Sequence, residues 1–162
     1  MKDLAALVEL NRFVGREFLL WLWFESDVFE TNLRTSGAGP CALWFEKQMT
    51  LASEGEETRV KSPSPAAAPE AKQALRQGKL PREARIRLVV DELEYEWVMK
   101  ADELAVAGLK VPAQLKGDAD KYEALYERMR LVEKLEAQLE ALFADFIALR
   151  LDAAWEAAVI GE

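Results

Sequence analysis

The feature that most constrains the fold of this chain is residues 18–24 (FLLWLWF), a run of seven consecutive apolar residues that includes two of the five tryptophans. A helix needs about 20 apolar residues to cross a bilayer, so this run is too short to be a membrane span. A helix that is apolar around its whole circumference is stable in water only if it is packed on more than one side. We therefore predict a buried core helix that the rest of the chain must cover.

The composition indicates one globular domain. The chain has 162 residues, 51% of them hydrophobic, which is enough to bury a substantial core. A single cysteine, Cys41, excludes an internal disulfide and fits a reducing compartment. The amino terminus carries an acid at Asp3 and lacks a signal-peptide cleavage site, so we expect a cytoplasmic protein. A net charge of −8 argues against a general affinity for nucleic acid but leaves room for a local basic patch.

Catalytic chemistry has little support in the residues. The chain contains no histidine, which removes imidazole acid–base catalysis, His-activated nucleophiles and the common His-containing metal sites. The carboxylates lie at ordinary helix-surface spacings and do not form a calcium-loop pattern. We expect a protein that is not an enzyme and that has neither a metal site nor a cofactor.

The middle of the chain predicts a small, mostly antiparallel sheet of about four strands. Residues 41–51 alternate apolar and polar side chains, with Lys47 as an interruption of the apolar face, and residues 57–61 are a plausible returning strand. Residues 83–91 and 95–100 alternate in the same way and form the clearest hairpin signal. Between the two pairs, a proline at a helix start and a closing Gly78 predict a short helix.

The last part of the chain predicts one long helix. From residue 118 to about 155 there is no proline or glycine, and apolar residues recur at alternating spacings of three and four. Such a helix would be roughly 55 Å long and would exceed the diameter of a small body, so part of it must project or pack on another subunit. Its first half, with many charges, is interpreted as an ordinary solvated surface. The candidate interface residues are Val132, Leu135, Leu139, Leu142, Phe146 and Leu149.

Two interpretations of this apolar seam remain open: an oligomer or assembly interface, and packing within the chain against residues 18–24. The predicted fold class is α+β, with the sheet packed on the apolar N-terminal helix. Residues 1–117 form the body, and residues 118–162 form a long amphipathic helix continuous with the same domain.

A basic cluster precedes and enters the predicted hairpin. Only one acid, Glu83, lies among six basic residues that could contact phosphates. The alternative is a solvated face, with cross-strand ion pairs from the hairpin arginines to Glu94 and Glu96. The six candidate nucleic-acid contacts are Lys72, Arg76, Lys79, Arg82, Arg85 and Arg87.

Four motifs, taken in order along the chain, resemble the carboxy-terminal half of the recombination-associated RdgC family. They are GREFLLWLWFESD (15–27), ALRQGK (74–79), ARIRLVV (84–90) and FADFIALRLD (143–152). In that family a helix ending in Gly-Lys likewise precedes a strand hairpin, and the closing helix carries an aspartate flanked by aromatics, matched here by Asp145.

The resemblance implies a non-catalytic protein that binds duplex DNA without sequence preference and limits recombinase filaments, as members of that family do by encircling DNA as dimeric rings. It carries a DNA-facing role over to Lys79 and to Arg82, Arg85 and Arg87. Because the amino-terminal half of the family has no counterpart here, the resemblance does not imply a closed ring.

Two functions follow as expectations. The first is a DNA-associated protein with a role in recombination, in which the basic residues neutralise phosphates and the long helix dimerises. The second is an acidic structural or adaptor subunit that assembles with itself or with another protein through its C-terminal helix. The expected partners are therefore duplex DNA, a second copy or a larger protein assembly, and not a membrane.

Overall fold

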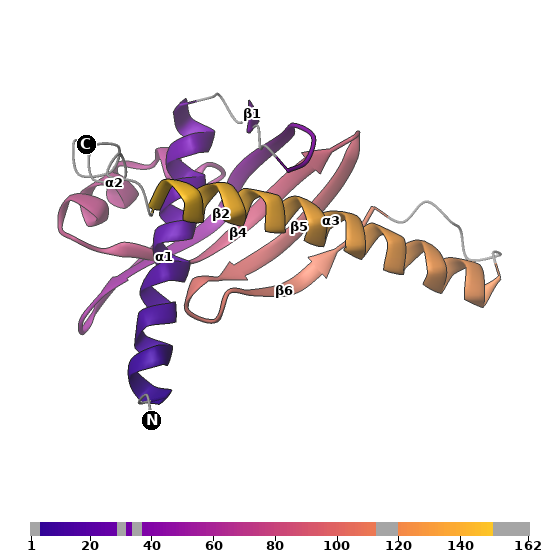
Figure 1. Cartoon of the computed structure of the whole chain (residues 1–162). Coiled ribbons are helices and arrows are strands. Elements are labelled where there is room, and N and C mark those ends of the chain that lie inside the picture. Colours follow the sequence, from indigo (N-terminus) through magenta and orange to yellow (C-terminus); the bar gives the residue numbers. More distant parts are fainter. Residues whose placement is uncertain (1–3, 29–31, 34–36, 113–119, 151–162) are drawn as a thin grey trace.

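The computed structural model describes residues 4–28, 32–33, 37–112 and 120–150, and it confirms an α+β fold (Figure 1). Helix α1 (Leu4–Val28) leads into a sheet, and helix α3 (Lys121–Arg150) follows it. The short helix α2 (Pro69–Arg76) and two single 3-10 turns, η1 (Pro65–Ala67) and η2 (Ala101–Glu103), connect the strands.

Among the described residues the sheet has six strands, all antiparallel to their neighbours. Its order is β1-β2-β4-β5-β6, with β3 paired to the same edge of β2 as β1. The strands are β1 (Asn32–Leu33), β2 (Cys41–Ser53), β3 (Glu56–Lys61), β4 (Leu80–Val90), β5 (Leu93–Lys100) and β6 (Ala105–Lys110).

Four of these strands match the predicted ones, and β1 and β6 are additional. The sequence of β6, AVAGLK, has only one β-branched residue and a glycine, so it carries a weak strand signal. Pairing with β5 holds it in the sheet, and Gly108 adopts a positive φ of 59° beside a register shift in that pairing. Tertiary pairing thus overrides a poor local preference.

Strand β2 confirms the predicted alternation but contains a bulge at its charged interruption. Phe45 pairs with Ile86 and Met49 with Ala84, so four steps along β2 match two steps along β4. Lys47 lies in this bulge with a φ of 66° and is exposed. Because the bulge adds two residues, Phe45 and Met49 both stay on the buried face, and Lys47 between them lies on the opposite one.

Helices α1 and α3 cover one face of the sheet and cross each other there (Figure 1). The predicted core run provides Phe18, Leu19, Trp21, Leu22 and Trp23 to the buried core. An aromatic cluster joins the two helices, with Phe18 ring centroids 5.1 Å from Phe143 and 5.4 Å from Phe146. The prediction of a core helix packed on several sides is confirmed.

Close contacts fix the position of both long helices. Gly15 of α1 lies directly against η2, where a Cβ on residue 15 would be 1.7 Å from the carbonyl oxygen of Ala101. Beside it, Arg16 donates two hydrogen bonds to the carboxylate of Asp102, at 2.6 and 3.0 Å. The hydroxyl of Tyr95 on β5 donates to the carbonyl of Leu131 on α3 at 2.8 Å. This hydrogen bond joins α3 to the sheet at the eleventh residue of the helix.

Helix α2 agrees with the predicted short helix and ends as expected at glycine. Gly78 has a φ of 88°, and the amides of Gly78 and Lys79 bond to the carbonyls of Leu75 and Ala74. These bonds satisfy the carbonyls of the last turn in a left-handed cap. The chain then enters β4 directly.

Candidate interaction surfaces

The structure divides the six predicted nucleic-acid contacts into paired and unpaired residues. The side chain of Lys79 is buried and donates to the Thr58 hydroxyl at 2.7 Å, with a Glu56 carboxylate oxygen at 3.8 Å. Arg82 forms an ion pair with Glu57 at 3.0 Å. Both cations therefore fasten β4 to β3.

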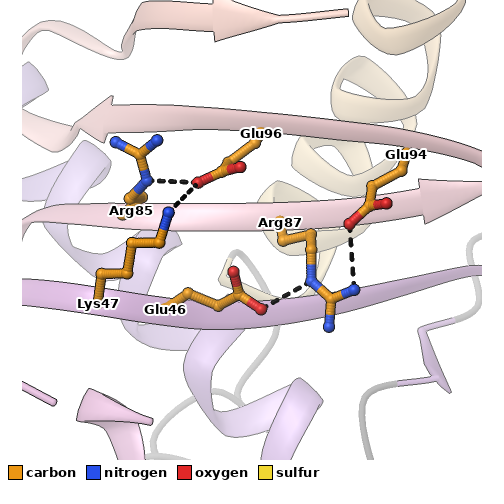
Figure 2. A network of polar contacts seen from close by, with 6 residues as sticks. All are labelled: Glu46, Lys47, Arg85, Arg87, Glu94 and Glu96. Carbon is orange, nitrogen blue, oxygen red and sulfur yellow. Dashed lines mark hydrogen bonds and ion pairs between the residues drawn. The ribbon is translucent and has the colours of Figure 1, made fainter. Parts of the chain in front are cut away.

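Arg85 and Arg87 belong to an ion-pair network on the sheet face opposite the helices (Figure 2). The Nε atom of Arg85 on β4 lies 2.5 Å from a carboxylate oxygen of Glu96 on β5. The Nζ atom of Lys47 on β2 lies 3.2 Å from the same oxygen. Arg87 bridges β2 and β5, with Nε 2.7 Å from Glu46 and Nη1 3.1 Å from Glu94. This network holds three cations and three carboxylates, so its formal charge is zero.

Two contacts favour the charged state of the groups in this network. The guanidinium carbon of Arg87 lies 4.1 Å from the ring centroid of Trp44, a cation–π contact that covers one side of the arginine. The hydrogen bond from Arg85 holds the pKa of Glu96 below its ordinary value, with Lys47 acting in the same direction. Cross-strand ion pairing, one of the two interpretations of these arginines, is thus present in the folded chain.

Lys72 and Arg76 differ from the other four residues. They lie one turn apart on α2, both are exposed, and neither forms an ion pair with the described part of the chain. A pair of lysine and arginine at this spacing presents its charges on the same helix face. Of the six predicted contacts, Lys72 and Arg76 are therefore the two that form no ion pair with the described residues.

A pocket of about 680 Å³ lies beside Lys72 and Arg76, between α1 and α2. Leu20, Trp21 and Leu75 contribute apolar lining, and Glu25 lies at the same pocket with its pKa raised by burial. The described lining has no serine, cysteine or threonine that could act as a nucleophile. The pocket therefore provides apolar surface without an evident catalytic group.

Comparison with known proteins gives no family for this chain. No protein-family model matches the sequence, and no curated protein matches it significantly. Function must therefore be argued from the surfaces of the molecule itself.

Within the described residues, no group of three or more Cys, Asp or Glu side chains could hold a metal ion. No helix in the same part of the chain is long and apolar enough to cross a membrane.

The predicted interface residues of α3 lie mostly inside the molecule. Leu135, Leu142 and Phe146 are at most 3% exposed and belong to the core shared with α1 and the sheet. The other three, Val132, Leu139 and Leu149, are half-buried. Of the two interpretations of this seam, packing within the chain is the one that the structure shows for its buried half.

The amino-terminal part of α3 extends beyond the sheet, past the edge at β6 (Figure 1). There the helix exposes a row of large apolar side chains, which we call the α3 stripe. It consists of Tyr122 (78% exposed), Leu125 (56%), Tyr126 (65%) and Met129 (53%). The spacing i, i+3, i+4 and i+7 places all four on one helix face.

The charges of this segment predict an ordinary solvated surface, and the stripe shows that prediction to be incomplete. Charged residues occupy every gap between the apolar ones, which hides the pattern when charges are counted. The apolar spacing itself was the available signal, because it continues the three-and-four rhythm of the buried seam towards the amino end of α3.

Proposed function

We propose that this chain is a non-catalytic structural or adaptor subunit that docks on a protein partner through the α3 stripe. The observation that supports this is the exposure of four large apolar side chains on one face of a helix whose other half is buried in the core. Large contiguous apolar patches on a soluble domain are typical of interaction sites. Anchors at i, i+3, i+4 and i+7 are the pattern by which one helix occupies the groove of a partner.

The helix that carries the stripe is held in place before any partner arrives. Tyr95 bonds its backbone at Leu131, Lys134 pairs with Asp91 at 2.6 Å, and Arg150 pairs with Glu17 near its far end. A rigid docking element loses little conformational entropy on binding, which favours affinity.

The test compares the size of the complexes that the wild-type chain and a stripe variant form in cells that naturally express the protein. We expect the wild-type chain to elute in a complex larger than a monomer, and Leu125→Glu/Met129→Glu to elute as a folded monomer. Gln73→Glu/Gln77→Glu, which adds two acids at exposed positions on and just after α2, is the matched control and should retain the complex. A wild-type chain that is strictly monomeric in fresh extract and after purification would refute this function.

We also propose a second candidate, association with duplex DNA and a role in recombination, because Lys72 and Arg76 are exposed and unpaired among the described residues. The resemblance to the RdgC family points in the same direction. Each neutralised phosphate contributes about −0.9 to the slope of log affinity against log salt. Two contacts therefore predict a slope of about −2, whereas six would give about −5.

The DNA candidate is tested by fluorescence anisotropy with a labelled duplex at several salt concentrations. Lys72→Ala/Arg76→Ala should abolish binding, while Lys100→Ala/Lys110→Ala, which removes two exposed lysines elsewhere, should leave most of it. No binding at low salt, or equal binding by both variants, would exclude this candidate.

A further inference from the structure

The charges beside the α3 stripe restrict what can dock there. On one flank, Leu125 is preceded by Lys121 at i−4 and followed by Arg128 at i+3, and both cations are exposed. Neither forms an ion pair with the described part of the chain. On the other flank, Tyr126 lies between Glu123 at i−3 and Arg130 at i+4, whose charges sum to zero. The stripe therefore has one basic flank and one neutral flank.

Beyond the stripe, the same face of α3 is acidic. Continuing along the same face, the helix exposes Glu133, Glu136 and Glu140 where it lies on the body. This row follows Met129 at spacings of four, seven and eleven residues, so it shares the direction of the stripe. A partner helix that extends along α3 in this direction would contact these glutamates after the apolar side chains of the stripe.

A second copy of the chain gains little from these charges. In an antiparallel pair the two basic flanks face each other, so their repulsion offsets the Glu123 and Arg130 attractions across the neutral flank. In a parallel pair the two glutamate rows face each other. The exposed fractions correspond to roughly 500 Å² per stripe, so a symmetric pair would bury about 1,000 Å², the lower limit for a specific interface.

We propose, on the basis of the assembly function above, that the α3 stripe binds an amphipathic helix of a different protein, with an apolar seam and acidic residues on the flank that meets Lys121 and Arg128. Such a helix covers the apolar side chains and neutralises both unpaired cations. The basic flank then determines which partner is accepted, and the apolar anchors provide most of the affinity.

The test uses the purified chain and two synthetic helical peptides of identical leucine seam. One peptide carries glutamate at all flanking positions and the other carries lysine. We expect the acidic peptide to bind at least tenfold more tightly in low salt, and the difference to shrink as salt rises. Lys121→Glu/Arg128→Glu should reverse the preference, while Lys72→Glu/Arg76→Glu, an equal charge change on α2, should not.

The outcomes separate this inference from the function on which it rests. Equal affinity for the two peptides, or a purified wild-type chain that dimerises through the stripe at tens of micromolar, would overturn the acidic-partner inference and leave the assembly function intact. Failure of both peptides to bind, together with a monomeric particle in extract, would overturn both.

Discussion

Replacing Gly15 by alanine should destabilise the protein, although the local helix preference predicts the reverse. In a helix interior alanine is about 1 kcal/mol more favourable than glycine. Here the added Cβ would lie 1.7 Å from the carbonyl oxygen of Ala101 and 2.7 Å from its carbonyl carbon. Both are backbone atoms, so no side-chain rotation can relieve the contact, and α1 must move away from η2.

The magnitude follows from what that movement disrupts. Overpacking a tight contact costs typically about 1–3 kcal/mol. The neighbouring Arg16 and Asp102 pair, with an arginine side chain only 9% exposed, would also be pulled out of its two-bond geometry, and a hydrogen bond to a charged group contributes about 1.5–3 kcal/mol. After subtracting the gain in helix preference, we expect a loss of about 2–4 kcal/mol. In a domain of this size that lowers Tm by roughly 5–15 °C.

The assay is urea unfolding followed by tryptophan fluorescence, with thermal unfolding by circular dichroism as a second measurement. Gly39→Ala is the control, because a Cβ at residue 39 would meet nothing within 4 Å. It should change the free energy of unfolding by less than about 0.5 kcal/mol. A Gly15→Ala protein as stable as the wild type, or more stable, would refute the close crossing of α1 and η2.

Three further predictions concern α3 and the open sheet face. Phe146→Ala should lower the free energy of unfolding by about 3–5 kcal/mol, because its ring is fully buried between α1 and the sheet. Leu125→Ala in the stripe should lower it by less than about 0.5 kcal/mol. Equal losses in chemical denaturation would contradict the division of α3 into buried and exposed halves. Tyr95→Phe should cost about 1 kcal/mol by removing the hydrogen bond to Leu131, and faster hydrogen exchange in the amino half of α3 would show that this bond anchors the helix; an unchanged exchange rate would count against that role. Because folding lowers the pKa of Glu96, its stabilising contribution is present above the unfolded pKa and is lost as pH falls through the folded pKa. The stability of Glu96→Gln should therefore depend less on pH below about 4.5 than that of the wild type. Identical pH profiles of the two proteins would show that the network contributes nothing.

The sequence predicted those parts of the fold in which local pattern and tertiary packing agree. The core run, the alternation of β2, the β4 and β5 hairpin and the glycine end of α2 all carry strong local signals, and each is present in the structure. The strand β6 could not be predicted in this way, because its residues become a strand only by pairing with β5. The bulge at Lys47 was visible in the sequence as an interruption, but its effect depends on the pairing between β2 and β4.

The candidate site was harder to predict, because charge pairing depends on the spatial register of strands. Six basic residues close in sequence suggested one patch, yet Glu46 and Lys47 of β2 take part in the network around Arg85 and Arg87 from about forty residues away. The register of β4 on β2 and β5 decides which cations are neutralised. A cluster of like charges in sequence therefore becomes a binding surface only where the fold brings no acids against it.

The same principle explains why we propose the main binding surface on α3 and not on the basic cluster. On the open sheet face, Lys47, Arg85 and Arg87 each form an ion pair with a glutamate, so binding an anion to them would first require breaking those pairs. On the projecting half of α3 no such competition exists, because the apolar side chains and the cations Lys121 and Arg128 contact no described neighbour that satisfies them. A partner that covers the stripe gains from removing its apolar surface from water. This difference supports the proposed docking role of α3 over the proposed phosphate binding.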